Sequence, residues 1–498
     1  MAAAADTALN PETGPARTRR AGIALPAREG RVIWLLLAAA FVAILNETTM
    51  GVAIPHLITD LSISALQAQW LTTGFMLTMA VVIPVTGFLL QRFTTRSAFV
   101  AAMSLFSTGT LIALLSPGFG MLVVARVVQA SGTAIMMPLL MTTLMTVVPA
   151  AQRGRMMGRV SIVISLAPAI GPTLSGLLLD HLSWRWIFGI VLPIALVALA
   201  VGARWVHNLG EPTHAPIDVL SVVLSALGFG GLVFGLSEIG EVARSAAAGG
   251  LAVATLAVSL GVGVVSLGLF GWRQILLQRR DDALLDLRVF RSVNFSLSIA
   301  QMGLMSVAFF GALTVLPLYL QSVLLADATQ TGLVLLPGSL AMGLAGPVIG
   351  RIYDRRGTRV LLVPGAIVTS AMLWVFTTVG ATTSVWFIAI VQTVLALGLA
   401  LSFTPLFTAS LASLQPRFYS YGSAVLGTVQ QVAGAAGIAL MITVFSAVSA
   451  SADGSAAEAG AAGARAAFLI AALASLPLIV GAFVIRKPAD EADAAPMH

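Results

Sequence analysis

Long apolar segments recur along almost the whole chain, and they limit the folds that are open to it. The first runs from Val32 to about Leu57, long enough at about 1.5 Å per residue to cross a hydrocarbon core of roughly 30 Å. A bilayer offers no partner to an unsatisfied backbone group, so each segment is expected to be helical. This predicts an all-α integral membrane protein with about fourteen transmembrane helices. The further runs lie at about 68–90, 97–116, 119–148, 155–179, 184–207, 217–239, 249–276, 294–322, 329–350, 359–379, 384–408, 420–448 and 464–485.

The composition excludes several classes of protein. Of the 498 residues, 58% are hydrophobic and 9% are charged, which does not fit a soluble globular domain. The net charge of +7 comes from Arg clusters between the apolar runs and not from a face that could follow nucleic acid. The chain has no Cys, and its only lysine is Lys487, so it has neither a disulfide nor a Walker phosphate loop. We therefore expect no enzyme activity, no cofactor and no metal, and if the protein pumps, its energy comes from an ion gradient or from a partner subunit.

The arginines between the apolar runs fall mostly on one side of the predicted membrane. Because Lys and Arg are enriched in cytoplasmic loops, that side and both termini are expected to be cytoplasmic. The opposite side carries only Arg185, Arg244 and Arg465. An Arg-rich, Lys-poor chain is typical of a GC-rich bacterial genome, so we expect a multi-pass protein of the bacterial inner membrane.

A short basic motif occurs twice and suggests how the helices are grouped. Gly87 to Arg96 and Gly350 to Arg359 both read Gly, four residues, Arg, three residues, Arg. If each joins the second and third helices of a bundle, the chain holds two six-helix repeats, an architecture of transporters with a site between the repeats. The alternative is that two ordinary basic loops match by chance. The predicted parts are a disordered cytoplasmic tail (1–30), an N-terminal six-helix bundle (31–208), two inserted helices with a cytoplasmic loop (209–292), a C-terminal six-helix bundle (293–486) and a disordered tail (487–498).

The first apolar segment carries an acid near its middle. Glu47 follows Asn46, and a charged carboxylate alone at this depth is costly. The acid is therefore expected to bind a proton, to pair with a cation, or to alternate between the two, which is how a proton can do work. Small residues at Ala39, Ala43 and Gly51 share its face and direct it into a bundle. The alternative is a structural carboxylate fixed to a neighbouring helix.

The fourth helix supplies a cation at a matching depth. Arg126 precedes Gln129 by one helical turn, and counting from the outer helix ends lets Arg126 face Glu47. A nearby Arg stays charged and keeps Glu47 ionised, and its withdrawal favours proton uptake. We predict that Glu47 and Arg126 carry proton coupling. The alternative is that Arg126 reaches out to the outer membrane surface.

Polar and flexible residues near these two are candidates for a substrate cavity. Below Arg126 the same face continues through Thr133 and Met137, and methionine adapts to varied apolar ligands. Ordinary helix packing is the alternative for this stripe, and a bond to another helix is the alternative for the glutamines. The candidate cavity residues are Asn46, Met50, Gln129, Thr133, Met137, Gln301 and Gln430.

Two further motifs are expected to control conformation. The fifth helix combines small residues with two prolines around Gly171, Pro172 and Gly176, and close packing with a kink suits a rocking interface. In the second basic loop, Asp354 can accept from Arg355 or Arg359 or lie at a helix N-terminus, so it can hold one conformation. The first loop has the uncharged Gln91 in this place. The candidate conformational residues are Gly87, Gln91, Arg92, Arg96, Gly171, Pro172, Gly176, Gly350, Asp354, Arg355 and Arg359.

These motifs resemble the major facilitator superfamily, and within it the fourteen-helix drug:proton antiporter branch. The loop after helix two is similar to that family's Gly-x-x-x-Asp-Arg signature, with Gln91 in place of Asp. Arg126-x-x-Gln129 resembles its Arg-x-x-Gln-Gly signature, and Gly171-Pro172 resembles its Gly-Pro antiporter signature. Asn46 occupies the position of an Asp in the first-helix signature. The chain is most similar to the subgroup that includes lincomycin-type antibiotic exporters.

The resemblance implies a proton-coupled multidrug or antibiotic exporter that works by alternating access. Its partners would be small hydrophobic or cationic drugs, protons and the lipid bilayer, with no nucleic acid and no nucleotide. A neutral or zwitterionic antibiotic is an alternative substrate. The chain could instead be a proton-coupled importer, an exporter of a specific metabolite, or a non-transporting sensor or scaffold. Finally, the Ser/Ala/Gly-rich run from Ser449 to Gly463 is expected to be an external loop.

Overall fold

The computed structural model describes residues 27–208, 218–244 and 250–485. Within them the chain forms fourteen long α-helices and no strand, and thirteen helices are long and apolar enough to cross a membrane. The predicted all-α membrane class is confirmed. The helices are α1 (Ala27–Asp60), α2 (Ala65–Arg92), α3 (Thr95–Leu114), α4 (Phe119–Val147), α5 (Arg153–His181), α6 (Arg185–Trp205), α7 (Val219–Arg244), α8 (Gly250–Leu277), α9 (Val293–Ser322), α10 (Ala328–Arg356), α11 (Arg359–Phe376), α12 (Val385–Ala412), α13 (Tyr419–Ser451) and α14 (Ala456–Val484).

Two boundaries differ from the sequence-based expectations. The predicted tail 1–30 overlaps α1, which already begins at Ala27, while residues 1–26 and the tail 487–498 lie outside the described residues. The run from Ser449 to Gly463 is not a loop, because α13 continues to Ser451 and α14 starts at Ala456. Alanine is the best helix former, and Ser455 begins α14 with a capping box to Glu458.

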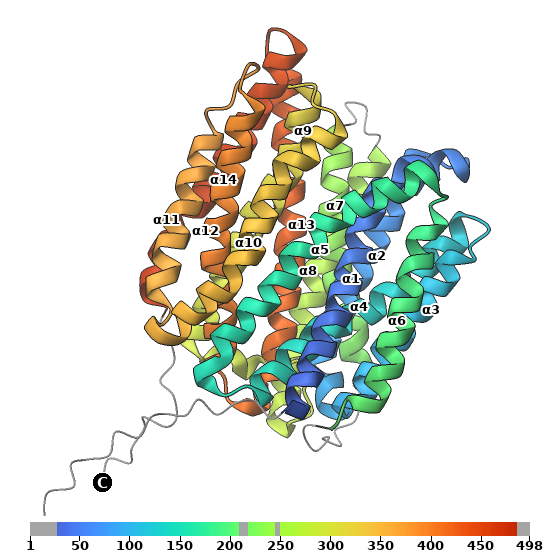
Figure 1. Cartoon of the computed structure of the whole chain (residues 1–498), viewed down its shortest axis with the longest axis vertical. Helices are drawn as coiled ribbons and strands as arrows, with labels where there is room; N and C mark the ends of the chain where they lie inside the picture. Colours follow the sequence, from blue (N-terminus) through green and yellow to red (C-terminus); the bar gives the residue numbers. More distant parts are fainter. Residues whose placement is uncertain (1–26, 209–217, 245–249, 486–498) are drawn as a thin grey trace, which may run out of the picture.

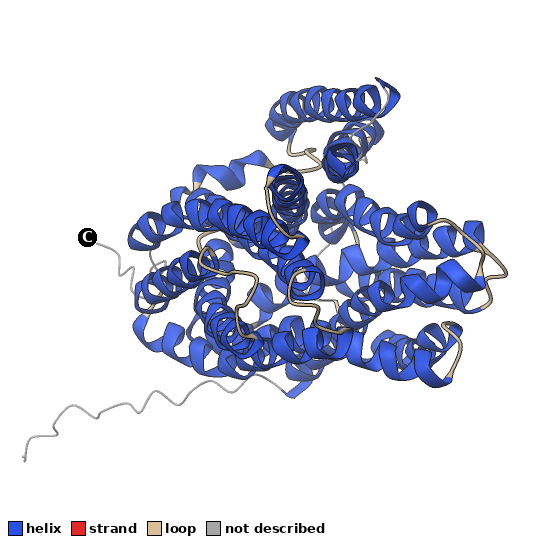
Figure 2. Cartoon of the chain, turned by 90° about the horizontal axis from the view of Figure 1, so that it is seen from above, coloured by secondary structure: helices blue, strands red, loops and turns tan. Residues whose placement is uncertain are grey.

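Helices α1 to α6 pack with one another, and so do α9 to α14. In Figure 1 the first group lies to the right and the second to the left, with α5 and α13 near the plane between them. Helix α7 packs against α2 of the first group and α13 of the second, whereas α8 packs mainly on α7. From above, this pair stands apart at the edge of the molecule (Figure 2). The insert therefore covers one side of the junction between the bundles.

The insert is held together at its Arg-rich end. Arg273 donates two hydrogen bonds, of 2.6 and 2.8 Å, to the carboxylate of Asp218. These bonds lower the pKa of Asp218 to about 2, so the pair stays charged at neutral pH. Gln274 donates to Ser221 on α7 and accepts from the backbone N–H of Leu285. The chain that leads from α8 to α9 is thus fixed to the insert.

The two bundles approach most closely between α5 and α10. Four glycines make this possible, because a Cβ on Gly154 would lie 2.6 Å from the carbonyl oxygen of Gly350, and one on Gly158 would lie 2.6 Å from the carbonyl carbon of Gly346. Nearby, Ser161 of α5 and Thr404 of α12 join their hydroxyls at 2.7 Å. These contacts lie in the halves of the helices next to the Arg-rich loops, so the structure is closed at that end.

This close approach yields a first prediction. Gly158→Val adds bulk where the backbone of α10 already lies, so the bundles are expected to separate at the Arg-rich end. Because the chain has no Cys, a Cys pair at Ser161 and Thr404 can report closure, and crosslinking in membranes should be several-fold slower in the valine variant. The control is Gly176→Val on the same helix, since a Cβ there meets nothing within 4 Å. Equal crosslinking of the Cys pair alone, with Gly158→Val and with Gly176→Val would contradict the prediction.

Candidate functional site

A network of buried polar side chains links the first four helices. Gln129 of α4 is fully buried, and its amide nitrogen donates to Oδ1 of Asn46 on α1 (3.1 Å) and to the hydroxyl of Thr110 on α3 (2.8 Å). Its amide oxygen accepts from Nη1 of Arg126 at 2.8 Å. The amide thus uses both of its N–H donors and one of its two acceptor sites. Gln129 is therefore the centre of the network, and Thr110 is a member that sequence reasoning missed.

Arg126 lies inside the bundle and does not reach the outer surface. Its side chain is 1% exposed, which rules out the surface position considered as the alternative. Its Nε donates to the carbonyl oxygen of Leu71 on α2 at 3.3 Å, and its guanidinium lies 4.1 Å from the centre of the Phe75 ring. A buried guanidinium needs such hydrogen bonds and ring contacts to offset the loss of water.

Glu47 lies beside this network and not in it. Within the described residues, no basic nitrogen lies within 4.0 Å of its carboxylate, so the predicted Glu47–Arg126 contact is not formed in this conformation. Arg126 is nevertheless the charged group that acts on Glu47 electrostatically. The Glu47 side chain is half-buried, whereas Asn46 is 1% exposed and its Nδ2 has no hydrogen-bond partner among the residues that the structure describes. The network thus ends on the neutral Asn46, and the acid points to a neighbouring face about 100° away.

The remaining candidate cavity residues are not gathered in one place. Met50 is buried in a packed cluster with Ala53 and Leu57. Thr133 is buried and bonds its own helix, at the carbonyl oxygen of Gln129. Gln301 donates to the carbonyl oxygen of Pro477 on α14, a contact within the second bundle. The last two, Met137 and Gln430, are half-buried.

Sequence reasoning missed an aromatic cluster in the second bundle. Phe309 of α9 meets Phe310 and Phe403 with ring centroids 5.1 and 5.8 Å apart, and Phe403 stacks on Phe407 one turn further along α12 at 6.5 Å. Phe310 lies against Gly434 of α13, where a Cβ would be 3.0 Å from the ring. The spacing of Phe403 and Phe407 by four residues was the available signal, since it places both on one face.

The predicted fifth-helix motif packs against α1. A Cβ on Gly171 would lie 3.1 Å from the Cβ of Thr48, and the hydroxyl of Ser175 donates to the carbonyl oxygen of Thr49 at 3.0 Å. Gly176 has open space beside it. The side chain of Pro172 lies outside the described part of the chain. The motif therefore fixes α5 to the helix that carries Glu47.

Asp354 connects the two bundles. Its two carboxylate oxygens accept from the backbone N–H groups of Gly154 and Arg155, each at 2.8 Å. These residues form the first turn of α5, so a carboxylate of the second bundle caps a helix of the first, where unpaired N–H groups and the helix dipole favour an anion. Of the loop arginines, Arg355 and Arg359 are exposed.

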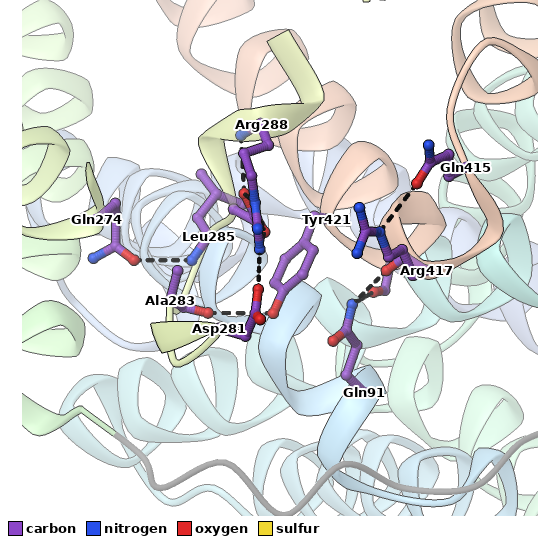
Figure 3. A network of polar contacts seen from close by, with 11 residues as sticks. Gln91, Gln274, Asp281, Ala283, Leu285, Arg288, Gln415, Arg417 and Tyr421 are labelled. Atoms are coloured by element: carbon purple, nitrogen blue, oxygen red, sulfur yellow. Dashed lines mark hydrogen bonds and ion pairs between the residues drawn. The ribbon is translucent and has the colours of Figure 1, made fainter. Parts of the chain in front are cut away.

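Gln91 makes the corresponding contact from the first bundle to the second. Its amide nitrogen donates to the carbonyl oxygen of Arg417 at 2.7 Å and to the hydroxyl of Ser420 at 3.1 Å (Figure 3). Gly87, one turn earlier, lies against Tyr421, with 3.1 Å from its potential Cβ to the ring. Arg92 is half-buried and Arg96 is exposed. Gln91 thus acts as a donor at the start of α13, whereas Asp354 acts as an acceptor at the start of α5.

The chain between α8 and α9 lies beside the Gln91 contact. Tyr421 donates from its hydroxyl to the carbonyl oxygen of Ala283 at 3.2 Å (Figure 3). Arg288 binds the carboxylates of Asp281 and Asp286, and its bond holds the pKa of Asp281 below the usual range. This segment therefore adds a third element to the closed end.

A second prediction tests the buried network. Gln129→Ala leaves the former partners of the amide on Asn46, Thr110 and Arg126 unsatisfied, at about 1 to 3 kcal/mol for each buried group. The melting temperature of the purified protein should fall by several degrees. Gln430→Ala is the control, because this half-buried glutamine lies outside the network. Similar melting temperatures for the two variants would argue against a structural network.

A third prediction compares the two contacts between bundles. Asp354→Asn removes the charge and one of two acceptors at the N-terminus of α5, so the transport rate should fall strongly. Gln91→Ala removes two neutral hydrogen bonds and should reduce the rate mildly. Contacts at a wet edge are worth about 1 kcal/mol or less, so protein abundance in the membrane should stay unchanged. Rates measured at matched abundance decide this, and equal defects would show that the carboxylate is immaterial.

Comparisons with known proteins agree with this architecture. The family model described as Major Facilitator Superfamily matches residues 36–438. The MFS-type transporter YcnB of Bacillus subtilis is 40% identical over 95% of this chain and 98% of its own length. The lincomycin resistance protein LmrB of Bacillus subtilis is 39% identical over 91% of this chain and 95% of its own length. The multidrug resistance protein B homolog of Mycobacterium tuberculosis is 30% identical over 82% of this chain and 75% of its own length.

A solved structure shares the fold at low sequence identity. The human organic anion transporter MFSD10 (TETRAN) superimposes with a TM-score of 0.61 at 14% identity, covering 92% of this chain and all of that one. At this identity the likeness concerns the arrangement of helices alone.

Proposed function

Because this chain belongs to the Major Facilitator Superfamily, we propose that it exports small hydrophobic compounds, antibiotics among them, in exchange for protons. It is a multi-pass membrane transporter. The names of its relatives, which refer to resistance to lincomycin and to multiple drugs, support an exporter of drugs.

The observation that carries proton coupling is the position of Glu47. This carboxyl group lies half-buried in the middle of a membrane helix, without an ion pair to any described residue, next to a network that contains a buried Arg. Because a charged carboxylate at such depth is costly, it can exchange a proton with whichever side of the membrane it faces. The charge on Arg126 acts on this exchange from outside contact distance.

Closure at one end supports alternating access. The bundles touch at the Arg-rich end through the α5–α10 glycines, Asp354 and Gln91. With that end in the cytoplasm, as the arginine distribution predicts, this conformation is closed toward the cytoplasm. Export then requires these contacts to release so that substrate can enter from the cytoplasmic side.

The aromatic cluster suits the proposed substrates. The half-buried ring of Phe309 can stack on flat apolar groups and attract a cation, whereas Phe403 and Phe407 are buried behind it in this conformation. This recognition needs no matched hydrogen bonds, so it tolerates substrates of different shapes.

Inverted membrane vesicles test the proposal with two probes, lincomycin and ethidium. Vesicles acidified inside should accumulate a probe when they contain the protein, and collapse of the pH gradient should release it. Accumulation that survives the collapse would contradict proton coupling, and probe loss on acidification would indicate import.

A fourth prediction concerns Glu47. Glu47→Gln keeps the size and hydrogen-bonding ability of the side chain but removes the proton site, so gradient-driven accumulation should drop to the level of empty vesicles. Glu238→Gln removes an acid near the outer end of α7 and should leave transport unchanged. Wild-type accumulation with unaltered pH dependence in Glu47→Gln would contradict the role of this residue.

A fifth prediction concerns Arg126. Arg126→Lys cannot make both the Leu71 and the Gln129 bonds with the same planar fork, and a buried Lys, unlike Arg, can lose its proton. We expect a lower rate and a shifted pH optimum of transport at normal expression. An unchanged pH profile would show that the charge at this position does not influence the proton step.

A further inference from the structure

An apolar cavity of about 390 Å³ lies between α1, α5 and α6 of the first bundle. Apart from the indole N–H of Trp34, the one polar group among its lining side chains is the hydroxyl of Thr49, which donates to the carbonyl oxygen of Asn46. The cavity therefore offers an incoming molecule apolar contacts. Its lining comes from α1 between Trp34 and Thr49, from α5 with Leu174 and Leu178, and from α6 between Ile187 and Ile194.

The cavity exists because α1 lies between two helices that make little contact with each other. Helix α1 packs against both α5 and α6, and Figure 1 shows it between them. The lining residues place α1 at the floor of a groove whose walls α5 and α6 provide. Leu37 on the floor and Val191 on the α6 wall are buried, whereas Trp34 and Ile194 at the rim are 56% and 47% exposed. The groove therefore opens sideways, where membrane helices meet hydrocarbon.

Two arginines lie at the Arg-rich end of this groove. The Arg159 guanidinium is 5.5 Å from the ring of Trp34, which itself lines the cavity, and Arg31 lies one turn earlier on α1, 6.0 Å from the ring of Trp205. Neither makes an ion pair with a carboxylate in the described part of the chain. Most of their N–H groups can thus serve an external anion.

The groove and the arginines match the two halves of one molecule. From Trp34 to Thr49, α1 rises by roughly 22 Å, comparable to the roughly 15 Å depth of one leaflet and somewhat beyond. An apolar chain fits such a groove, and guanidinium groups bind phosphate oxygens in pairs. Basic pockets between membrane helices are typical sites for acidic lipid head groups.

We propose that this groove binds an anionic phospholipid, with one acyl chain between α5 and α6 and the phosphate at Arg159 and Arg31. An apolar drug dissolved in the bilayer could fill the same groove, but it would make no use of the two guanidinium groups. The charge at the end of the groove therefore favours the lipid.

Tryptophan quenching in nanodiscs tests this site without a transport assay. The probes are brominated phosphatidylglycerol and brominated phosphatidylcholine. Both are diluted into one common background of unbrominated phosphatidylcholine. The signal of Trp34 is the difference between the wild type and Trp34→Phe. Phosphatidylglycerol should quench this signal at a several-fold lower mole fraction than phosphatidylcholine.

Three variants separate the head group from the groove. Arg159→Gln combined with Arg31→Gln should abolish the preference for phosphatidylglycerol, whereas Arg279→Gln, at the same membrane level on the remote insert, should preserve it. Ala38→Phe fills the exposed mouth of the groove and should weaken quenching by both lipids. Equal quenching by the two lipids in the wild type, or a preference that survives loss of both arginines, would overturn the proposal. If lincomycin or ethidium displaces brominated phosphatidylglycerol at a lower concentration than unbrominated phosphatidylglycerol does, the groove is a drug site instead.

Discussion

A guanidinium buried within a membrane bundle is the constraint on which the packing of the first four helices depends. A charge removed from water costs several kcal/mol unless its donors are used. Arg126 meets this need with a backbone carbonyl and a ring of α2 and with the amide of Gln129. Because Gln129 bonds both Asn46 and Thr110 in turn, α1, α2 and α3 are all positioned around one charge on α4.

The contacts between the bundles answer a different requirement, because the proposed alternating access needs them to form and break. Glycines allow the backbones of α5 and α10 to touch without interlocking side chains. Asp354 adds a charge–dipole contact at the start of α5, and Gln91 adds neutral bonds at the start of α13. The two contacts have opposite polarity, because Asp354 accepts from backbone N–H groups and Gln91 donates to a backbone carbonyl. A repeat of the sequence motif has therefore kept the place of the contact and changed its chemistry.

The sequence predicted what depends on local pattern. Apolar length located the helices, and the run at 449–463 was misread only because its many small residues were taken as a loop signal although Ala favours helix. The site was harder to predict because it depends on how helices rotate about their axes. Counting residues put Glu47 and Arg126 at similar depth. It could not show that Asn46, and not Glu47, bonds to the network through Gln129. For the same reason the sequence could not show that Gln301 donates a hydrogen bond to α14. Nor could it show that Phe309 of α9 and Phe403 of α12, 94 residues apart, are in contact.

The displacement of the acid by one residue changes how coupling can work. A contact ion pair inside the membrane must be broken at large cost each time the acid takes a proton, whereas an acid at a distance responds to the field of the cation. The Coulomb energy falls as the inverse of distance, from about 4 kcal/mol at 4 Å to about 2 kcal/mol at 8 Å for an effective dielectric constant of about 20. Asn46 holds α1 to the network through a neutral hydrogen bond. A shift of α1 by a few ångströms therefore changes the Coulomb energy between Glu47 and Arg126 by about as much as one hydrogen bond contributes. In the proposed coupling, proton exchange at Glu47 can therefore follow the motion of α1 and α5 while Arg126 keeps its hydrogen bonds to Leu71 and Gln129.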